Sequence, residues 1–324
     1  MPPSPIPEKP ATSQSFARAV ATVGLWTAVS RVLGFVRDVV IAAALGAGPI
    51  ADAFFIAFRL PNFFRQLFGE GAFNAAFVPI FSQKLAQDKA QPAPEPVSNP
   101  DSNPDSAHNF ANQSVAFMGL GLLILTILGE IWMSGLVSLL ARGFQDALRF
   151  DLAVSLSRIT FPYMFLICLA ALYSGVLNSL GKFAAAAATP VLLNLTTIAA
   201  ALFPKLFPSI DRVLAQIFGG TWQMEKLLPN IGYSLAWGIL LAGVWQLAWL
   251  HRNAARYGMR LRPVWFYRRQ SPTQPRQLSP AIRQLMQRMG PGLFGAGIVQ
   301  VNLLIGTQIA TFLPIGAVSY LYYA

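Results

Sequence analysis

The chain has 324 residues, of which 54% are hydrophobic and only 11% are charged. Soluble domains carry about 25% charged residues, so this composition excludes a soluble globular protein and indicates an integral membrane protein. The formal net charge is +11, and the single cysteine excludes a disulfide framework and a thiol metal site.

Seven apolar segments follow one another, at residues 21–45, 50–81, 114–141, 152–180, 184–203, 231–250 and 291–323. Each segment comes near or exceeds the ~20 residues that a helix needs to cross the hydrocarbon core. The sequence therefore predicts an all-α fold, a polytopic bundle of membrane helices. Residues 1–15 are rich in proline and lack the pattern of a cleaved signal peptide, so we expect a disordered tail.

The first two segments contain charged residues at depths where a membrane helix normally has none. These residues are Arg31, Arg37, Asp38, Asp52, Arg59, Arg65 and Glu70. One ionisable side chain at the centre of a membrane helix costs roughly 2.5 to 3.5 kcal/mol. Several of them together must therefore pair with one another, lie near the membrane surface, or face a water-filled cavity.

The pattern of these charges favours a site for an anion. Arg31 and Asp38 are seven residues apart, as are Asp52 and Arg59, so each helix carries opposite charges on one stripe. Pro61 is expected to kink the second segment. The set has four arginines and three acids, which leaves one positive charge even if every acid is paired. Arginine suits phosphate because its planar guanidinium group donates two parallel hydrogen bonds. Structural pairing between helices is the alternative interpretation.

Three connections have compositions of their own. Residues 88–109 are rich in Pro, Ser, Asn and Asp, so we expect a disordered loop in which His108 is solvated. Residues 251–282 form a linker dense in arginine. Residues 204–230 contain apolar residues at helical spacing, which predicts a short amphipathic helix on the outer membrane surface. The residues of this apolar face are Ile210, Val213, Leu214, Ile217 and Phe218.

The loop charges predict an orientation. By the positive-inside rule the basic linker at 251–282 is cytoplasmic. Counting spans back from it places the N-terminus, the 88–109 loop and the turn at Gly181 on the cytoplasmic side, and the 204–230 loop on the outer, periplasmic side. Because the basic residues lie beside membrane spans, topology and anionic lipid head groups explain the net charge, and no nucleic acid partner is expected.

The run from Ser30 to Gln83 closely resembles the opening of the MurJ/MviN family of bacterial lipid II flippases, in the MOP exporter superfamily. It contains the motifs SRVLG, GFVRD, ADAFF, LPNFF and GEGAF, and the resemblance continues through 158–194, 289–302 and the closing GAVSYLYYA. It implies two six-helix lobes related by pseudo-symmetry. Residues 16–250 would form the N-terminal six-helix transmembrane lobe, and residues 283–324 the first helix of a truncated C-terminal lobe, so we expect a fragment.

The resemblance also implies a function. Family members move undecaprenyl-pyrophosphate-linked peptidoglycan precursor (lipid II) across the inner membrane by alternating access. The charged motif positions line their central cavity, which makes Arg31, Arg37 and Arg65 the first candidates for contacting the pyrophosphate. The acids of the set are expected to orient these arginines or to exchange partners between states. Partners implied are lipid II, membrane lipids and, as further candidates, cell-wall synthesis proteins. No cofactor, metal or catalytic residue is implied.

Three other classes of function can be weighed against the sequence: an enzyme, a related exporter and a scaffold. An enzyme would need a nucleophile with a base, a metal cluster or a carboxylate pair, but His108 and His251 lie in or beside loops, so no enzyme is expected. A related exporter of a drug or of another polyprenyl-linked sugar is the main alternative, and a cationic cavity disfavours a cationic drug. The third class is a non-transporting scaffold for cell-wall enzymes. Glu130 matches no family motif and is expected to be structural.

Overall fold

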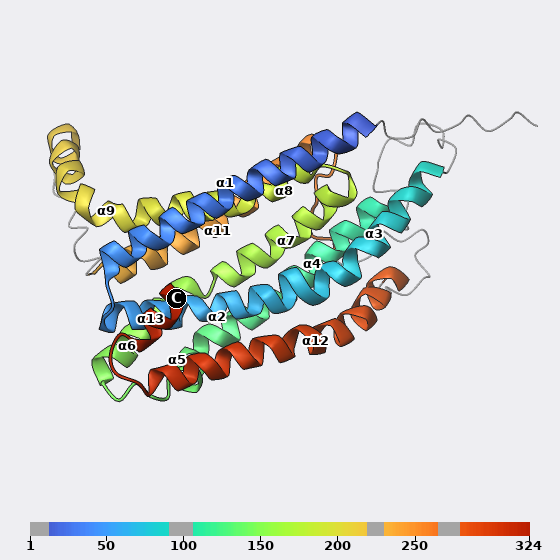
Figure 1. Ribbon diagram of the computed structural model, residues 1–324. Coiled ribbons are helices and arrows are strands. Elements are labelled where there is room, and N and C mark those ends of the chain that lie inside the picture. The colour runs from blue at the N-terminus through green and yellow to red at the C-terminus, as the bar shows by residue number, and fades with distance from the viewer. Residues whose placement is uncertain (1–12, 91–105, 219–229, 265–278) are drawn as a thin grey trace, which may run out of the picture.

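The computed structural model describes residues 13–90, 106–218, 230–264 and 279–324, with the side chains of 13–19, 69–72 and 207–218 left aside. Every regular element in these ranges is a helix, and no strand occurs within them. The helices lie side by side in an elongated bundle (Figure 1). The predicted all-α fold is therefore confirmed.

The elements follow in chain order. The first group is α1 (Ser13–Leu45), α2 (Pro49–Phe64), the π-helical segment η1 (Arg65–Ala72) and α3 (Phe73–Ala90). The middle group is α4 (Ala107–Ile131), α5 (Met133–Leu140), α6 (Ala147–Thr160) and α7 (Tyr163–Ser179). The last group is α8 (Phe183–Ala187), α9 (Thr189–Phe218), α11 (Ile231–Arg256), α12 (Pro280–Thr311) and α13 (Ala317–Tyr323).

Five helical segments are long and apolar enough to cross a membrane. They are Ala107–Ile131, Ala147–Ser179, Phe183–Leu206, Ile231–Arg256 and Pro280–Thr311. These five correspond to the last five predicted spans. The first two predicted spans are helical as well, in α1 and in the continuous run from α2 to α3, but they are not among the five. The chain is thus a multi-pass membrane protein.

Local backbone chemistry divides several predicted spans. The third span begins earlier than predicted, at Ala107, and breaks at Trp132. The fourth breaks between α6 and α7, because Pro162 has no backbone N–H with which to continue the helix. The seventh ends in a turn at Gly316, whose φ of 95° favours glycine, before α13 begins.

The predicted loop boundaries were wrong at their edges. α3 continues to Ala90 and α4 begins at Ala107, so the 88–109 loop is shorter than predicted, and the half-buried His108 lies in the first turn of α4. The amphipathic stretch is not a separate helix but the end of α9, which turns away from the bundle (Figure 1). The linker at 251–282 begins inside α11. Residues 1–12, 91–105, 219–229 and 265–278 lie outside the described ranges.

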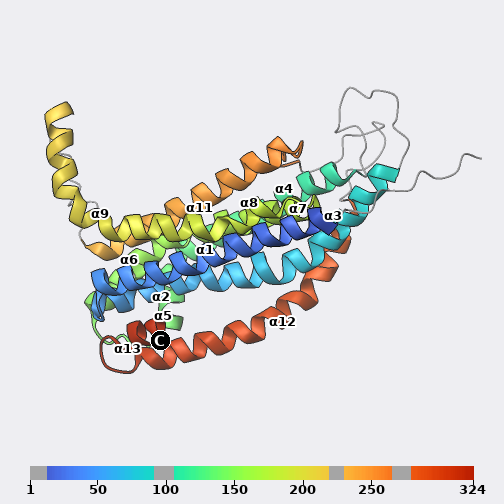
Figure 2. The ribbon, with the colours of Figure 1, turned by 45° about the horizontal axis from the view of Figure 1, so that its top comes forward.

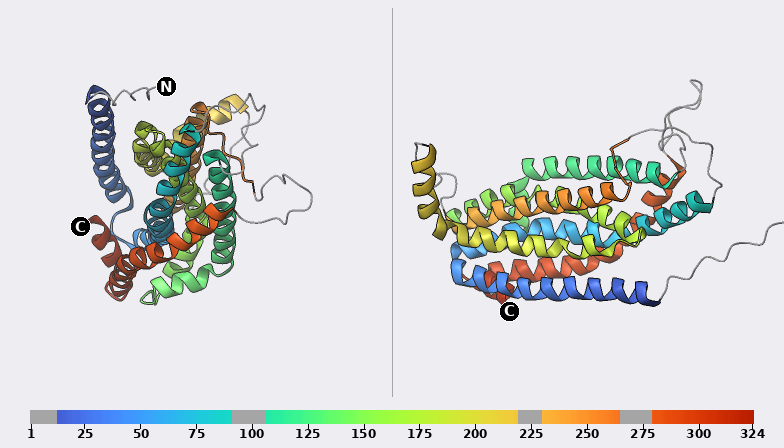
Figure 3. Two further views of the ribbon diagram at one scale, coloured as in Figure 1. Left: turned by 90° about the vertical axis from the view of Figure 1, so that its right-hand side faces the viewer. Right: turned by 90° about the horizontal axis from the view of Figure 1, so that it is seen from above.

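Four helices form the centre of the bundle. Each of α2, α6, α7 and α11 packs against at least two of the others. A stack of phenylalanine rings continues this core into α3 and α4, with centroids 5.1 to 5.4 Å apart. Its members are Phe73, Phe77, Phe81 and Phe110. α1 packs on α8 and α9 at one edge, and α12 packs on η1 and α3 at another (Figures 2 and 3).

The hydrogen bonds at the start of α4 predict that residues 91–105 act as a spacer. Asp88 Oδ2 accepts the Ala107 N–H at 2.8 Å, and Ser106 Oγ accepts the Asn109 N–H at 3.2 Å. The helix end is thus capped without residues 91–105. We expect a Gly/Ser linker of equal length to leave thermal unfolding in detergent unchanged, whereas Asp88→Ala should lower the free energy of unfolding by about 1 kcal/mol. A linker variant less stable than Asp88→Ala would contradict this.

Candidate functional site

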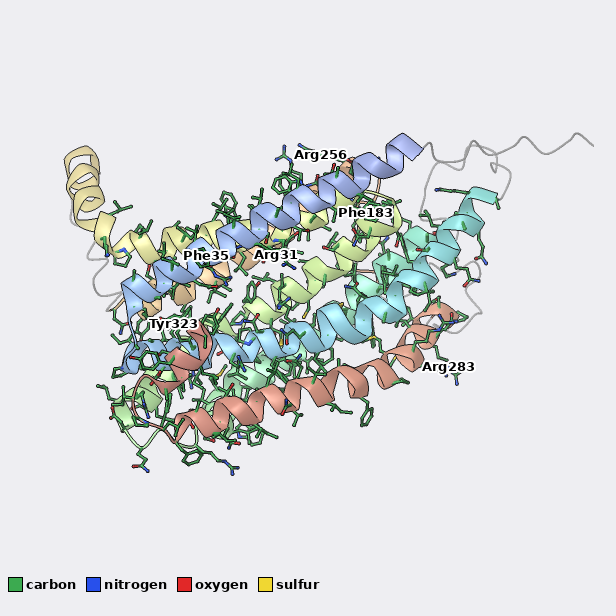
Figure 4. All side chains as sticks on the ribbon, viewed as in Figure 1. Arg31, Phe35, Phe183, Arg256, Arg283 and Tyr323 are labelled. Atoms are coloured by element: carbon green, nitrogen blue, oxygen red, sulfur yellow. The ribbon has the colours of Figure 1, made fainter. Side chains whose placement is uncertain are left out.

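A cavity of about 610 Å³ opens inside the bundle. Its walls come from α1, α2, η1, α3, α7, α8, α9, α11, α12 and α13. Its charged lining residues are Arg31, Arg37, Arg59 and Arg65, and no acid lines it among the residues that the structure describes. Arg31 lies near the middle of α1 (Figure 4). The cavity is therefore lined by cations, carboxamides and aromatic rings.

Protein groups hold two of the arginines firmly. Arg37 donates to Asp38 Oδ1 from Nη2 at 2.8 Å and from Nε at 2.9 Å, and to Asn194 Oδ1 from Nη1 at 3.0 Å. Asn194 in turn donates to the Ser30 carbonyl at 2.9 Å, which ties α9 to α1. Arg59 Nη2 donates to the Leu303 carbonyl of α12 at 3.1 Å. These contacts fix the direction in which each guanidinium group points.

The other two arginines differ in their local backbone and in their partners. Arg65 begins the π-helical segment η1, and its Nε donates to Asn62 Oδ1 at 3.2 Å. The kink predicted from Pro61 is a π-helix that follows α2, and such segments occur frequently at functional sites. Arg31 is exposed and makes no hydrogen bond or ion pair with any described residue. It is the arginine most available to a ligand.

The three acids of the predicted site are not gathered in the cavity. Asp38 pairs with Arg37, and its side chain is 44% exposed. Asp52 does not line the cavity, and the side chain of Glu70 lies outside the described part of the chain. The role of all seven residues in binding stays a prediction, but the structure places the four arginines together.

Asp52 is the centre of a buried polar cluster. It is 1% exposed and pairs with Arg149 of α6, Nη1 to Oδ2, at 3.4 Å. The same carboxylate accepts the Gly316 N–H at 2.7 Å and, from Ser319, the N–H at 3.0 Å and the hydroxyl at 2.6 Å. A carboxylate at a helix N-terminus is favourable because it meets unpaired N–H groups and the positive end of the dipole. Asp52 therefore fastens α13 to α2 and α6.

Sequence reasoning missed Asn194, Arg149 and Tyr322. Tyr322 lines the cavity and stacks on Phe55 with centroids 4.0 Å apart. Asn194 was detectable in principle, since a carboxamide in an apolar span is also costly to bury. Arg149 lies at a span edge, where an arginine cannot be told from a topology signal.

Comparisons with known proteins give one consistent family. A family model described as "Lipid II flippase MurJ" matches residues 41–324. The probable lipid II flippase MurJ of Rhizobium meliloti (strain 1021) is 40% identical over 316 residues, covering 96% of this chain and 50% of that protein. The lipid II flippase MurJ of Burkholderia cenocepacia is 34% identical over 316 residues, covering 95% and 52%.

A solved structure has a similar fold. It is titled a lipid II flippase MurJ in an inward closed conformation, with a TM-score of 0.64 and 24% identity, covering 93% of this chain and 53% of that one. At this identity the likeness shows the fold alone. The chain spans about half the length of the curated relatives it matches.

The Asp52 cluster predicts that removing Asp52 alone destabilises the protein more than removing Asp52 and Arg149 together. Asp52→Ala should lower the free energy of unfolding by about 3 kcal/mol, because it leaves Arg149 buried without a counter-ion. Adding Arg149→Met should recover part of this loss. Asp38→Ala is the matched control and should cost less than about 1 kcal/mol, because the Asp38 side chain is 44% exposed, against 1% for Asp52. Equal losses in Asp52→Ala and Asp38→Ala, measured by chemical unfolding in detergent, would contradict the prediction.

Proposed function

The chain belongs to the MurJ family of lipid II flippases, and from that membership we propose that it supplies one half of a flippase for lipid II. In this proposal the lipid-linked peptidoglycan precursor crosses the inner membrane by alternating access through the arginine-lined cavity. The relatives are named as lipid II flippases and are about twice as long as this chain. The activity of the whole protein is therefore proposed as the joint work of this half and a second one.

The single observation that carries the proposal is a cavity lined by arginines and by no described acid. A pyrophosphate is an anion whose oxygens match the forked donors of guanidinium groups. The volume of about 610 Å³ is within the range of cavities that hold drug-sized ligands. It is several times the size of a pyrophosphate, so a sugar attached to the phosphate fits the remaining space. Four arginines disfavour a cationic drug as cargo.

The predicted site residues take separate roles in this proposal. Arg31, Arg37 and Arg65 contact the pyrophosphate, and Asp38 orients Arg37, with which it pairs. Asp52 closes the outer end by holding α13 against α2, and its partners must separate for the outward state to form. Glu70 follows Arg65 within η1 and is proposed to exchange partners with it.

The orientation is also proposed, with the N-terminus in the cytoplasm. Lys182 lies over the ring of Tyr257 with Nζ 4.8 Å from the centroid, which brings the α7–α8 turn beside the basic end of α11. Arg256 is the last residue of α11, and Arg260 follows it in the chain, so both lie at this end of the bundle. Positive charge concentrated at one end of a membrane bundle is typical of the cytoplasmic side.

Cysteine labelling tests this orientation. The native Cys168 is buried, so labelling reports introduced cysteines alone. An impermeant thiol reagent added to intact cells should label Leu148→Cys, whose parent residue is 78% exposed, and should spare Arg260→Cys. Permeabilised cells should label both variants. Labelling of Arg260→Cys in intact cells would reverse the orientation and with it the direction of transport.

Complementation tests the function. Residues 1–324 joined to the second half of the Rhizobium meliloti relative should restore growth and outward movement of lipid II in a flippase-depleted strain. Arg31→Ala should abolish both, and Arg31→Lys should restore them partly, because lysine keeps the charge but loses the planar fork. Arg256→Ala, an exposed arginine outside the cavity, is the matched control and should behave like the parent. Normal growth and transport with Arg31→Ala at normal expression would reject the anion cavity.

A further inference from the structure

The cavity contains three polar side chains that carry no charge and have no hydrogen-bond partner among the described residues. They are Gln66 of η1, Ser174 of α7 and Gln300 of α12, and all three are half-buried. A polar group inside a membrane bundle is costly unless it meets water or a partner. These three side chains therefore need water or a ligand in the cavity.

Two of them belong to neighbouring helices that run in the same direction. η1 packs against α7. Cys168 Sγ of α7 lies 3.9 Å from the carbonyl oxygen of Phe64, which immediately precedes η1. Further along, the place where a Cβ of Gly175 would stand is 3.0 Å from Asn74 Oδ1 of α3. The polar residues of η1 and α7 both lie between these two contacts, so they occupy one part of the cavity.

α12 brings the third side chain to the same part of the cavity. It packs against η1 on the side of its cavity-lining residues. Arg59 Nη2 donates to the Leu303 carbonyl at 3.1 Å. Leu67 of η1 lies 3.8 Å from the place where a Cβ of Gly297 would stand. α12 therefore runs antiparallel to α2 and η1, and Gln300, which lies between these two contacts along α12, is close to the level at which η1 begins.

The hydrogen-bonding capacity of these side chains differs from that of the cavity arginines. A guanidinium group only donates hydrogen bonds, whereas a carboxamide or a hydroxyl both donates and accepts them. A fully ionised diphosphate only accepts, so it satisfies guanidinium groups but offers no donor to a carboxamide or hydroxyl oxygen. A ligand that satisfies both kinds of side chain must carry hydroxyl or amide groups next to its phosphates.

The position of the three side chains fits a group attached directly to a phosphate. Gln66 follows Arg65 in the chain, and both line the cavity. On α7, Ala170 and Ala171 line the cavity one turn before Ser174, and their short side chains leave room for a ligand. In a lipid-linked precursor the sugar is the first group after the diphosphate, and a peptide attached to that sugar lies farther away. The sugar is therefore the part of the cargo nearest to this position.

We propose that Gln66, Ser174 and Gln300 form a subsite that recognises the uncharged sugar attached to the diphosphate of the cargo. Their oxygens accept hydrogen bonds from the hydroxyl and amide groups of the sugar, and their N–H and O–H groups donate to its oxygens. A site built to hydrogen-bond such groups discriminates against a ligand that lacks them. This inference rests on the proposed function and adds to it the residues that select a sugar-bearing diphosphate over a bare one.

Two ligands of equal charge test the inference: farnesyl diphosphate esterified with N-acetylglucosamine, and farnesyl diphosphate esterified with methanol. Their affinities are measured by calorimetric titration of the 324-residue chain in lipid nanodiscs, with empty nanodiscs as the blank. The parent should bind the sugar ester more tightly than the methyl ester. Gln66→Leu and Gln300→Leu should each weaken binding of the sugar ester about fivefold, the effect of losing one neutral hydrogen bond, and should change binding of the methyl ester less than about twofold.

A glutamine outside the cavity supplies the matched control. Gln308 lies on α12 but does not line the cavity, so Gln308→Leu should bind both esters like the parent. Thermal unfolding identifies the variants that fold, and Ser174→Ala takes the place of a leucine variant that does not. Equal affinities of the parent for the two esters, or equal losses for both esters in the cavity variants, would overturn the subsite.

An uncharged probe separates this inference from the proposed function. Octyl N-acetylglucosaminide carries the sugar without a phosphate. If neither ester binds to the parent, the diphosphate cargo of the proposed function is rejected, and the glycoside alone decides the subsite. Binding of the glycoside that Gln66→Leu weakens would then support the subsite, and no binding to the parent would overturn it. If the methyl ester binds as tightly as the sugar ester, the subsite fails while the proposed function stands.

Discussion

The rest of the structure depends on the need to solvate or pair the arginines that lie inside apolar helices. An arginine in hydrocarbon is costly, so each one needs water or a partner. The bundle meets this condition by its packing. α1 packs on α8 and α9, and α12 packs on η1 and α3, while residues of both helices line one cavity together with all four arginines. The cavity therefore results from the way α1 and α12 pack against the rest of the bundle.

The positive character of the cavity depends on where the nearest buried acid points. Asp52 belongs to the same helix as Arg59, yet its carboxylate is taken up by Arg149 and by the N-terminal N–H groups of α13. Those partners satisfy a buried charge that would otherwise be expensive. Because Asp52 is used in this way, it does not neutralise the cavity. One carboxylate thereby joins three helices and leaves the arginines available to an anion.

Irregular backbone appears at the points where the site is built. The π-helical segment begins at Arg65, and an extra residue per turn alters the direction in which its side chains point. Gly316 takes a φ of 95°, which a residue with a Cβ rarely adopts, and this turn presents its N–H to Asp52. Regular helices form most of the bundle. The π-helical segment positions Arg65, and the turn at Gly316 joins α13 to Asp52.

The sequence by itself determined the all-α membrane class, the approximate positions of the seven helical segments and the charged residues that the first two contain, because apolar length and the cost of buried charge can be read along the chain. It did not determine where helices break, since the apolar pattern continues across Trp132 and Pro162. It also could not say that Asp38 and Asp52 would be absent from the lining of the cavity. Asp52 meets Arg149 across 97 residues and Ser319 across 267. Such partners are brought together only by helix packing, which local periodicity does not encode, so the tertiary structure alone decided that four arginines share a cavity from which Asp52 is turned away.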